Sequence, residues 1–194
     1  MTKLMKNLFL FLFLLIFSDT FTQIVNYDQF DSKLFDQLLI DKINNYRLSV
    51  GLKSLFVSNT LKNYTSEKTA TYCANNEFAN HMKFSKTNDS INQKLYEELY
   101  YFTNGLCGTK SPSNIFINEG IGEIISVKKI NNVTYEELAT ITLKSWLDSP
   151  GHKKVIESQF TDIGLNSGMI SCSSKLSKTK VVYTSCNFVA ISNY

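Results

Sequence analysis

The seven residues Trp-Leu-Asp-Ser-Pro-Gly-His, at positions 146–152, end the helical part of this 194-residue chain. Thr134 and Glu137 upstream of them have the spacing of a capping box, which predicts that a helix begins there and continues to Trp146. The Ser149-Pro150 step must stop that helix, because the residue before a proline is disfavoured in helical geometry. The segment therefore separates a helix from the part of the chain that follows it.

β-rich sequence follows this boundary, in two short runs at residues 163–170 and 181–191 with a polar loop at 173–180 between them. Such a pattern predicts an antiparallel hairpin. A further stretch at 115–127 is rich in β-branched residues and glycine, which indicates a strand or an extended turn region. Because strands come late and do not alternate regularly with helices, the sequence predicts an α+β domain rather than a Rossmann or barrel fold.

Helical patterns occupy much of the chain before the boundary. Apolar residues recur at helical spacing over residues 30–50, and Gly51 is suited to the left-handed position after that helix. A second helix is expected to begin with Ser58 or Asn59 as its N-cap. A short amphipathic helix is expected over residues 89–102.

Several separated segments together indicate a family. Ile-Asn-Asn-Tyr-Arg at 43–47 with Gly-Leu-Lys-Ser-Leu at 51–55 is similar to an opening helix and turn. Asn-Glu-Gly-Ile-Gly at 118–122 is similar to a Gly-Glu-Asn-Ile-Ala segment, although both neighbours of the glutamate differ. Residues 146–152 and Phe-Thr-Asp-Ile-Gly-Leu at 160–165 are similar to Trp-x-x-Ser-Pro-Gly-His and a Phe-x-x-Ile-Gly-Val strand. In this order the segments resemble the CAP superfamily of cysteine-rich secretory, antigen 5 and pathogenesis-related proteins, and most closely its bacterial SCP-like extracellular branch.

The resemblance implies a three-layer α-β-α sandwich with a mainly antiparallel sheet, formed by residues 23–194 as a single domain. It also implies a central cleft that holds two histidines and usually two acids. By position the histidines are His81 and His152, the only two in the chain. The first acid is Glu119, which is also the candidate general base.

The second acid is left open by the sequence. Animal members of the family place a glutamate where this chain has Ser149, and Glu123 and Asp148 are the nearby substitutes. Two neutral imidazoles, a carboxylate and a water are a typical ligand set for zinc with an open position. Zinc held by His81, His152 and Glu119 is therefore the cofactor that the resemblance implies. The same side chains could equally form a hydrogen-bonded cluster without metal.

Two functions are compatible with this cleft. The favoured one is a secreted binding module for a lipid or sterol-like small molecule or an extracellular protein, because no motif supplies an activated serine or cysteine nucleophile. The alternative is a metal-assisted, protease-like hydrolase, in which zinc lowers the pKa of a bound water and Glu119 acts as base. A third reading treats the cleft as a structural remnant and assigns the function to surface loops such as residues 89–113.

The first residues of the chain predict export. Lys3 and Lys6 precede an apolar run at residues 8–17, which is too short to cross a membrane and is typical of a signal peptide. We expect the signal peptide to cover residues 1–22, with an uncleaved anchor as the alternative. The mature protein is then secreted, extracellular or periplasmic, without a transmembrane segment.

The four cysteines are read in that oxidising context, where an even number indicates disulfides. Cys172 and Cys186 lie on either side of the polar hairpin loop and are the favoured pair. Cys73 and Cys107 would then pair by exclusion, although four cysteines allow three connectivities. None of them has the spacing of a zinc ribbon or a thioredoxin-like site.

Charge and two further residues complete the expectations. The chain has 20 Lys and Arg against 17 Asp and Glu, so its net charge of +3 gives no reason to expect a nucleic-acid partner.

Arg47, the only arginine, is expected to bind a loop or helix end through its planar set of donors. Trp146 is expected to pack in the core beside the cleft.

Overall fold

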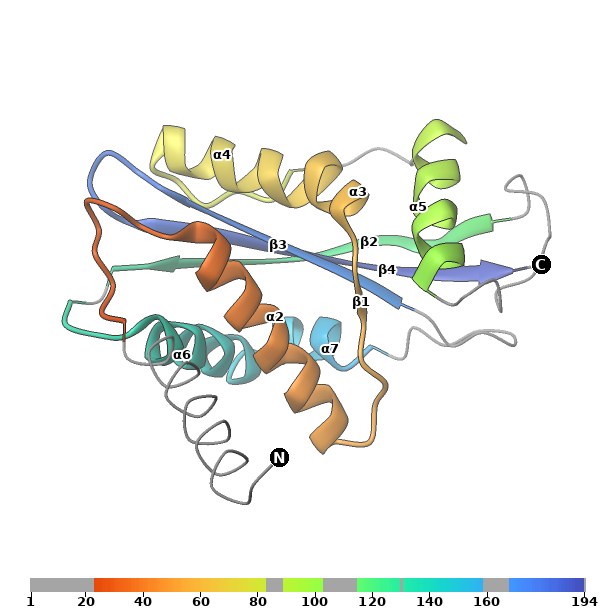
Figure 1. Cartoon of the computed structure of the whole chain (residues 1–194), viewed down its shortest axis with the longest axis horizontal. Helices are drawn as coiled ribbons and strands as arrows, with labels where there is room; N and C mark the ends of the chain where they lie inside the picture. The colour runs from red at the N-terminus through yellow and green to blue at the C-terminus, as the bar shows by residue number, and fades with distance from the viewer. Residues whose placement is uncertain (1–22, 83–88, 103–114, 130, 159–167, 194) are drawn as a thin grey trace, which may run out of the picture.

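The computed structural model describes residues 23–82, 89–102, 115–129, 131–158 and 168–193. Within them, one four-stranded sheet lies between helices on its two faces (Figure 1). This arrangement confirms the predicted α+β class. The predicted signal peptide, Cys107 and the segment 160–165 lie outside the described residues.

The sheet has the strand order β1-β3-β4-β2. It consists of β1 (Phe56–Val57), β2 (Ile115–Lys128), β3 (Gly168–Leu176) and β4 (Val182–Asn193). β4 is antiparallel to both of its neighbours, whereas β1 pairs with β3 in parallel. The sheet is therefore mixed, with mainly antiparallel pairing as predicted. The short strand β1 has no periodic pattern and was not predicted.

The hairpin of β3 and β4 confirms the prediction for the end of the chain, with a shorter connection. β3 continues to Leu176, so half of the predicted polar loop belongs to the strand, and the backbone N–H of Ser177 donates to the Val181 carbonyl oxygen (2.9 Å). Cys172 and Cys186 are opposite each other in the register of the pair and form a disulfide, as predicted.

Cys73 is a buried free thiol in the structure. Its sulfur lies 3.4 Å from the Asn80 backbone nitrogen, and burial raises the pKa of the thiol. Because Cys107 lies outside the described residues, its pairing in the oxidised protein stays a prediction.

One helical layer contains α2 (Ser32–Ser49), α6 (Tyr135–Leu147) and α7 (Pro150–Ile156), below the sheet in Figure 1. α2 ends as predicted, with Gly51 in the left-handed region (φ 80°). The capping box of Thr134 and Glu137 is present at the start of α6. α6 also stops before Pro150, but this proline opens α7, a helix that was not predicted, because proline fits the first turn of a helix.

The other layer contains α3 (Asn59–Leu61), the π-helix η1 (Lys62–Ser66), α4 (Glu67–Asn76) and α5 (Asp89–Phe102). Figure 1 shows α3 and α4 above the sheet. Ser58 is the N-cap of this region, as predicted, and its hydroxyl accepts from the Leu61 backbone N–H (3.0 Å). The π-helix places both Thr65 and Ser66 in the interior.

α5 is attached to α3 through Glu98. One carboxylate oxygen accepts from the Thr60 backbone N–H and hydroxyl (both 2.9 Å), and the other accepts from the Ser58 hydroxyl. Negative charge at the start of a helix is favourable, because the first backbone N–H groups there lack partners within the helix.

The main core lies between the sheet and the layer of α2 and α6. Trp146 is only 1% exposed, and its indole N–H donates to the Ile125 carbonyl oxygen (2.9 Å), which confirms its predicted place in the core. Arg47 is buried and donates to the carbonyl oxygens of Lys53, Ile156 and Ser158. It therefore holds a loop and the end of α7, the role expected of it.

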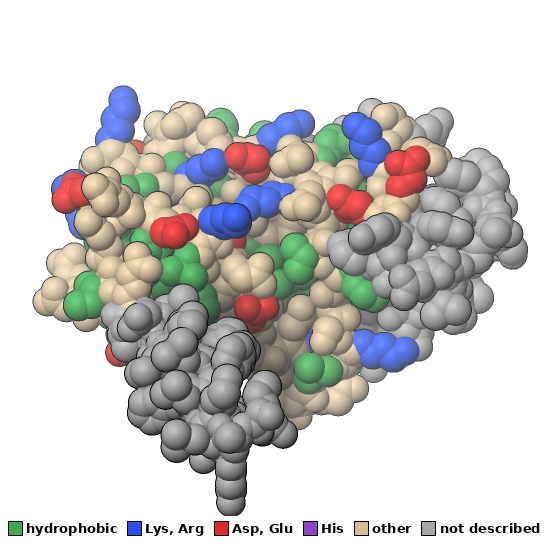
Figure 2. All heavy atoms as spheres, viewed as in Figure 1, with side chains coloured by type: hydrophobic (Ala, Val, Ile, Leu, Met, Phe, Trp, Pro, Cys, Tyr) green, Lys and Arg blue, Asp and Glu red, His purple; other side chains and the backbone are tan. Residues whose placement is uncertain are grey.

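The face shown in Figure 2 carries interspersed Lys and Asp or Glu side chains, with no large area of one sign among its described residues. No histidine side chain is visible in this view. In the part of the chain that the structure describes, none of the helices combines the length and apolar character needed to span a bilayer.

Candidate functional site

His81 and Glu123 form the centre of the candidate site. The His81 Nδ1 lies 2.9 Å from the Glu123 Oε2, at hydrogen-bond distance. The His81 side chain is 61% exposed, whereas the Glu123 side chain is only 7% exposed. The pair therefore has a buried acid behind an imidazole that solvent can reach.

His81 reaches this position because α4 ends shortly before it. Glu77 adopts the left-handed conformation (φ 52°) at the C-cap of α4, and its backbone N–H bonds to the Cys73 carbonyl oxygen. The chain then turns, and Asn80 lies against the Cys73 sulfur. This turn directs the chain to β2, where Glu123 lies.

Glu123 is held by three groups besides His81. Its Oε1 accepts from the hydroxyls of Thr69 (2.7 Å) and Ser185 (3.1 Å) and faces the Asn187 Nδ2 at 3.5 Å. Thr69 belongs to α4, and Asn187 is the cross-strand partner of Glu123 in β4. The carboxylate is therefore fixed by both the helix above it and the strand beside it.

His152 is brought to the same region by α7. At Gly122, next to Glu123, a Cβ atom would lie only 3.1 Å from the Val155 Cγ1, so glycine permits the close approach of this helix to β2. His152 precedes Val155 by three residues and shares its side of the helix. Burial lowers the pKa of His152, and the positive charge of His81 lowers it further.

The three acids considered from the sequence, Glu119, Glu123 and Asp148, lie in different positions relative to the histidines. Glu123 contacts His81, whereas Asp148 is the C-cap of α6 and has no described contact with either histidine. Glu119 lies where the register of β2 against β4 shifts, between Asn118 and Gly122, and its side chain is outside the described part. Of the predicted site residues, the structure brings His81 and Glu123 into hydrogen-bond contact.

Sequence reasoning missed the groups that hold Glu123, because isolated Ser, Thr and Asn residues on buried faces carry no motif. The position of Glu123 itself did have a signal. Gly122-Glu123-Ile124-Ile125 has the Gly-Glu-x-Ile spacing that was assigned to residues 118–122, with a glycine directly before the acid.

The described residues contain no group of three His, Cys, Asp or Glu side chains placed to hold a metal ion. Within those residues, no hydroxyl or thiol is hydrogen-bonded to either imidazole, whereas a serine or cysteine nucleophile needs such a base. What the arrangement offers is two imidazoles, one of them supported by a buried carboxylate.

Comparisons with known proteins agree with this architecture. Among solved structures, an outer surface protein from Borrelia burgdorferi is similar with a TM-score of 0.53 and 17% sequence identity, over 84% of this chain and 96% of that one. At that identity the likeness concerns the fold alone. A search of curated proteins found no match. The model of the cysteine-rich secretory protein family, CAP, matches residues 40–188, and the chain belongs to this family.

Proposed function

We propose that this CAP-domain protein is a secreted binding module in which His81 and His152 hold a zinc ion whose remaining positions are open to a ligand. The observation that supports this most is the contact of the His81 Nδ1 with the buried Glu123 carboxylate. Histidines that bind metals usually direct the other ring nitrogen to a carboxylate or carbonyl, which fixes the ring and makes it a better ligand.

The chemistry of the donor set fits zinc. Metal-binding imidazole must be neutral, and the lowered pKa of His152 favours its neutral form at pH 7. Zinc accepts imidazole nitrogen readily and is usually tetrahedral, so two histidines leave further positions. Glu119 remains the predicted third protein ligand.

Binding is supported better than covalent catalysis. Neither imidazole has a hydroxyl or thiol partner among the described residues, so the histidines have no nucleophile to activate there. A lipid or sterol-like molecule remains the proposed small ligand, because it is the ligand class that the CAP resemblance implies. The disulfide of Cys172 and Cys186 supports export to an oxidising compartment.

Isothermal titration of the purified protein with zinc tests the proposal. We expect one binding event in the wild type and its loss in His81→Gln and in His152→Gln. Glu123→Gln should weaken zinc binding by about 10- to 100-fold, the usual effect of changing a residue that orients a ligand. Asp148→Asn is the matched control and should bind as the wild type does. Unchanged affinity in both histidine variants would exclude this site.

The hydrolase alternative uses the same site and is tested with one additional variant, Glu119→Gln. It requires zinc-dependent cleavage of a protein or ester substrate that disappears in His152→Gln and in Glu119→Gln. Such an activity would replace the binding proposal, whereas zinc binding without turnover supports it.

A further inference from the structure

A continuous group of buried polar side chains lies between α4 and the sheet, behind Glu123. Four residues of this group are fully buried: Ser66, Thr69, Ser185 and Asn187. They come from η1, α4 and β4, and all but Ser66 are within 3.5 Å of the Glu123 carboxylate. Buried polar groups of this kind are costly unless every donor finds an acceptor.

The direction of these hydrogen bonds follows from Asn187. Its side-chain oxygen accepts from the Ser66 hydroxyl (2.9 Å) and lies 3.1 Å from the Ser185 hydroxyl. Its nitrogen therefore faces Glu123, and an amide nitrogen can only donate. The opposite orientation would place two acceptors, the amide oxygen and the carboxylate, against each other.

Ser66 supports this orientation from the π-helix. Its hydroxyl contacts the hydroxyl (2.5 Å) and the carbonyl oxygen (3.1 Å) of Ser171, besides the Asn187 oxygen. When the Ser171 hydroxyl donates to Ser66, Ser66 donates to Asn187 and Ser185 is free to donate to Glu123. The hydrogens of Thr69, Ser185 and Asn187 then point toward the Glu123 Oε1.

We propose that Thr69, Ser185 and Asn187 are positioning residues that keep Glu123 a hydrogen-bond acceptor and thereby fix the His81 proton on Nδ1. These three donors surround the Glu123 Oε1 and leave its Oε2 as the acceptor that faces the His81 Nδ1. An ionised Glu123 has no hydrogen to give, so the His81 Nδ1 must donate, and the lone pair of the neutral ring is on Nε2.

This inference rests on the proposed function, because it selects Nε2 as the nitrogen that binds the metal. It also requires one particular tautomer of His81, which the proposal of zinc binding by itself does not specify. The buried donors, as well as the two histidines, determine whether the site can bind zinc. An isosteric change at Glu123 should therefore change which nitrogen of the His81 ring carries the hydrogen.

The test uses ¹⁵N NMR of the two imidazoles, measured without metal at a pH where both rings are neutral. With only two histidines in the chain, a His152→Gln variant assigns the His81 signals. We expect the Nδ1–H form in the wild type. In Glu123→Gln the three donors hold the amide oxygen at the place of Oε1, so the amide nitrogen must donate to His81 and the hydrogen moves to Nε2.

The ratio of the two tautomers should change by about 100-fold or more between these proteins, which corresponds to about 2.7 kcal/mol. Adding Asn187→Leu to Glu123→Gln removes the donor that orients the amide and should return part of the Nδ1–H form. Glu136→Gln, at a surface pair with Lys42, is the matched control and should leave His81 unchanged.

An Nε2–H ring in the wild type would overturn the inference, even if Glu123→Gln failed to fold. An Nδ1–H ring that persists in folded Glu123→Gln would also overturn it, because the donors would then not orient residue 123. These outcomes are independent of zinc. A wild type that shows the expected tautomer but binds no zinc would contradict the proposed function and leave the positioning network in place.

Discussion

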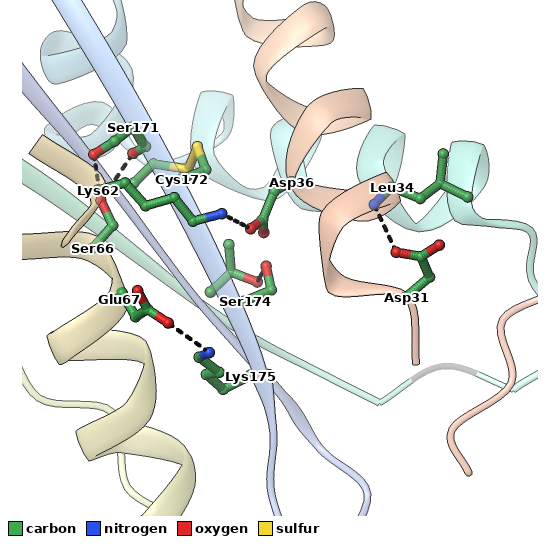
Figure 3. Close-up of polar contacts among 12 residues, drawn as sticks. Asp31, Leu34, Asp36, Lys62, Ser66, Glu67, Ser171, Cys172, Ser174 and Lys175 are labelled. Atoms are coloured by element: carbon green, nitrogen blue, oxygen red, sulfur yellow. Dashed lines mark hydrogen bonds and ion pairs between the residues drawn. A yellow bond between two sulfur atoms is a disulfide. The ribbon is translucent and has the colours of Figure 1, made fainter. Parts of the chain in front are cut away.

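Replacing Asp36 with Asn should stabilise the protein at neutral pH, although it removes one partner of an ion pair. Asp36 lies on α2 and is 4% exposed. Its Oδ2 accepts from the Nζ of Lys62 (2.9 Å), a residue of η1 whose side chain extends toward Asp36 (Figure 3). Its Oδ1 has no hydrogen-bond partner among the described residues. Such a carboxylate loses more hydration than a single lysine returns.

The pKa of Asp36 reflects this net loss of hydration. It is raised from 3.8 to about 6, because the effect of burial exceeds the opposing effects of the Lys62 charge, the Ser174 hydroxyl and the Lys175 charge. Ser174 also shares a hydrogen bond with Thr184 (3.0 Å), which limits what it offers to Asp36.

The sign of the pH dependence follows from this raised pKa. Between pH 3.8 and about 6 the folded protein keeps a proton on Asp36 that the unfolded chain has released, so its free energy of unfolding falls as pH rises. At about 1.4 kcal/mol for each pH unit, Asp36 lowers the stability by about 3 kcal/mol once the pH is above 6. Asparagine resembles the neutral acid and should remove that loss. Lys62 keeps 32% of its side chain exposed and can return to water.

Urea unfolding of the wild type and Asp36→Asn between about pH 4 and pH 8 measures this difference. The two proteins should have similar stability near pH 4, and the variant should be more stable by up to about 3 kcal/mol at pH 7. The matched control is Asp28→Asn, which removes an exposed pair with Lys180 and should change stability by less than about 1 kcal/mol at any pH. A variant that is less stable than the wild type at pH 7 would show that the ion pair outweighs the cost of burial.

Two further predictions concern the core and the hairpin. Trp146→Ala should lower the free energy of unfolding by about 3 to 5 kcal/mol, because it empties a large buried site and leaves the Ile125 carbonyl oxygen without its donor. A change below about 1 kcal/mol in urea unfolding would contradict that placement. The Cys172→Ala/Cys186→Ala variant should lose about 3 kcal/mol, the value for a loop of about 15 residues, and an unchanged thermal midpoint would contradict it.

Local chemistry made much of the fold predictable. The capping box at Thr134, the N-cap at Ser58 and the left-handed glycine at position 51 each depend on backbone groups a few residues away, and all three are present. The pairing of Cys172 with Cys186 was also predictable, because a hairpin places residues on either side of its loop opposite each other.

Features that depend on distant parts of the chain were not predictable. β1 is a strand only because β3 pairs with it, and two residues have no periodicity of their own. The Ser149-Pro150 step carries both a stop signal and a start signal, and the packing of α7 on Gly122 determines that a helix follows. The π-helix places Ser66 beside Asn187, residues that are 121 positions apart in the sequence.

The two glutamates of β2 show most clearly where sequence reasoning ends. Glu119 and Glu123 are an even number of positions apart, so in a regular strand their side chains would share a face, and alternation could not choose between them. The register against β4 shifts between Asn118 and Gly122, which breaks that equivalence. Glu123 lies in the regular ladder beyond the shift, opposite Asn187, where the buried donors are. Pairing with β4 thus determines which glutamate contacts His81. This explains how the family motif can be recognised correctly although the acid beside the histidine is Glu123, four residues beyond the predicted Glu119.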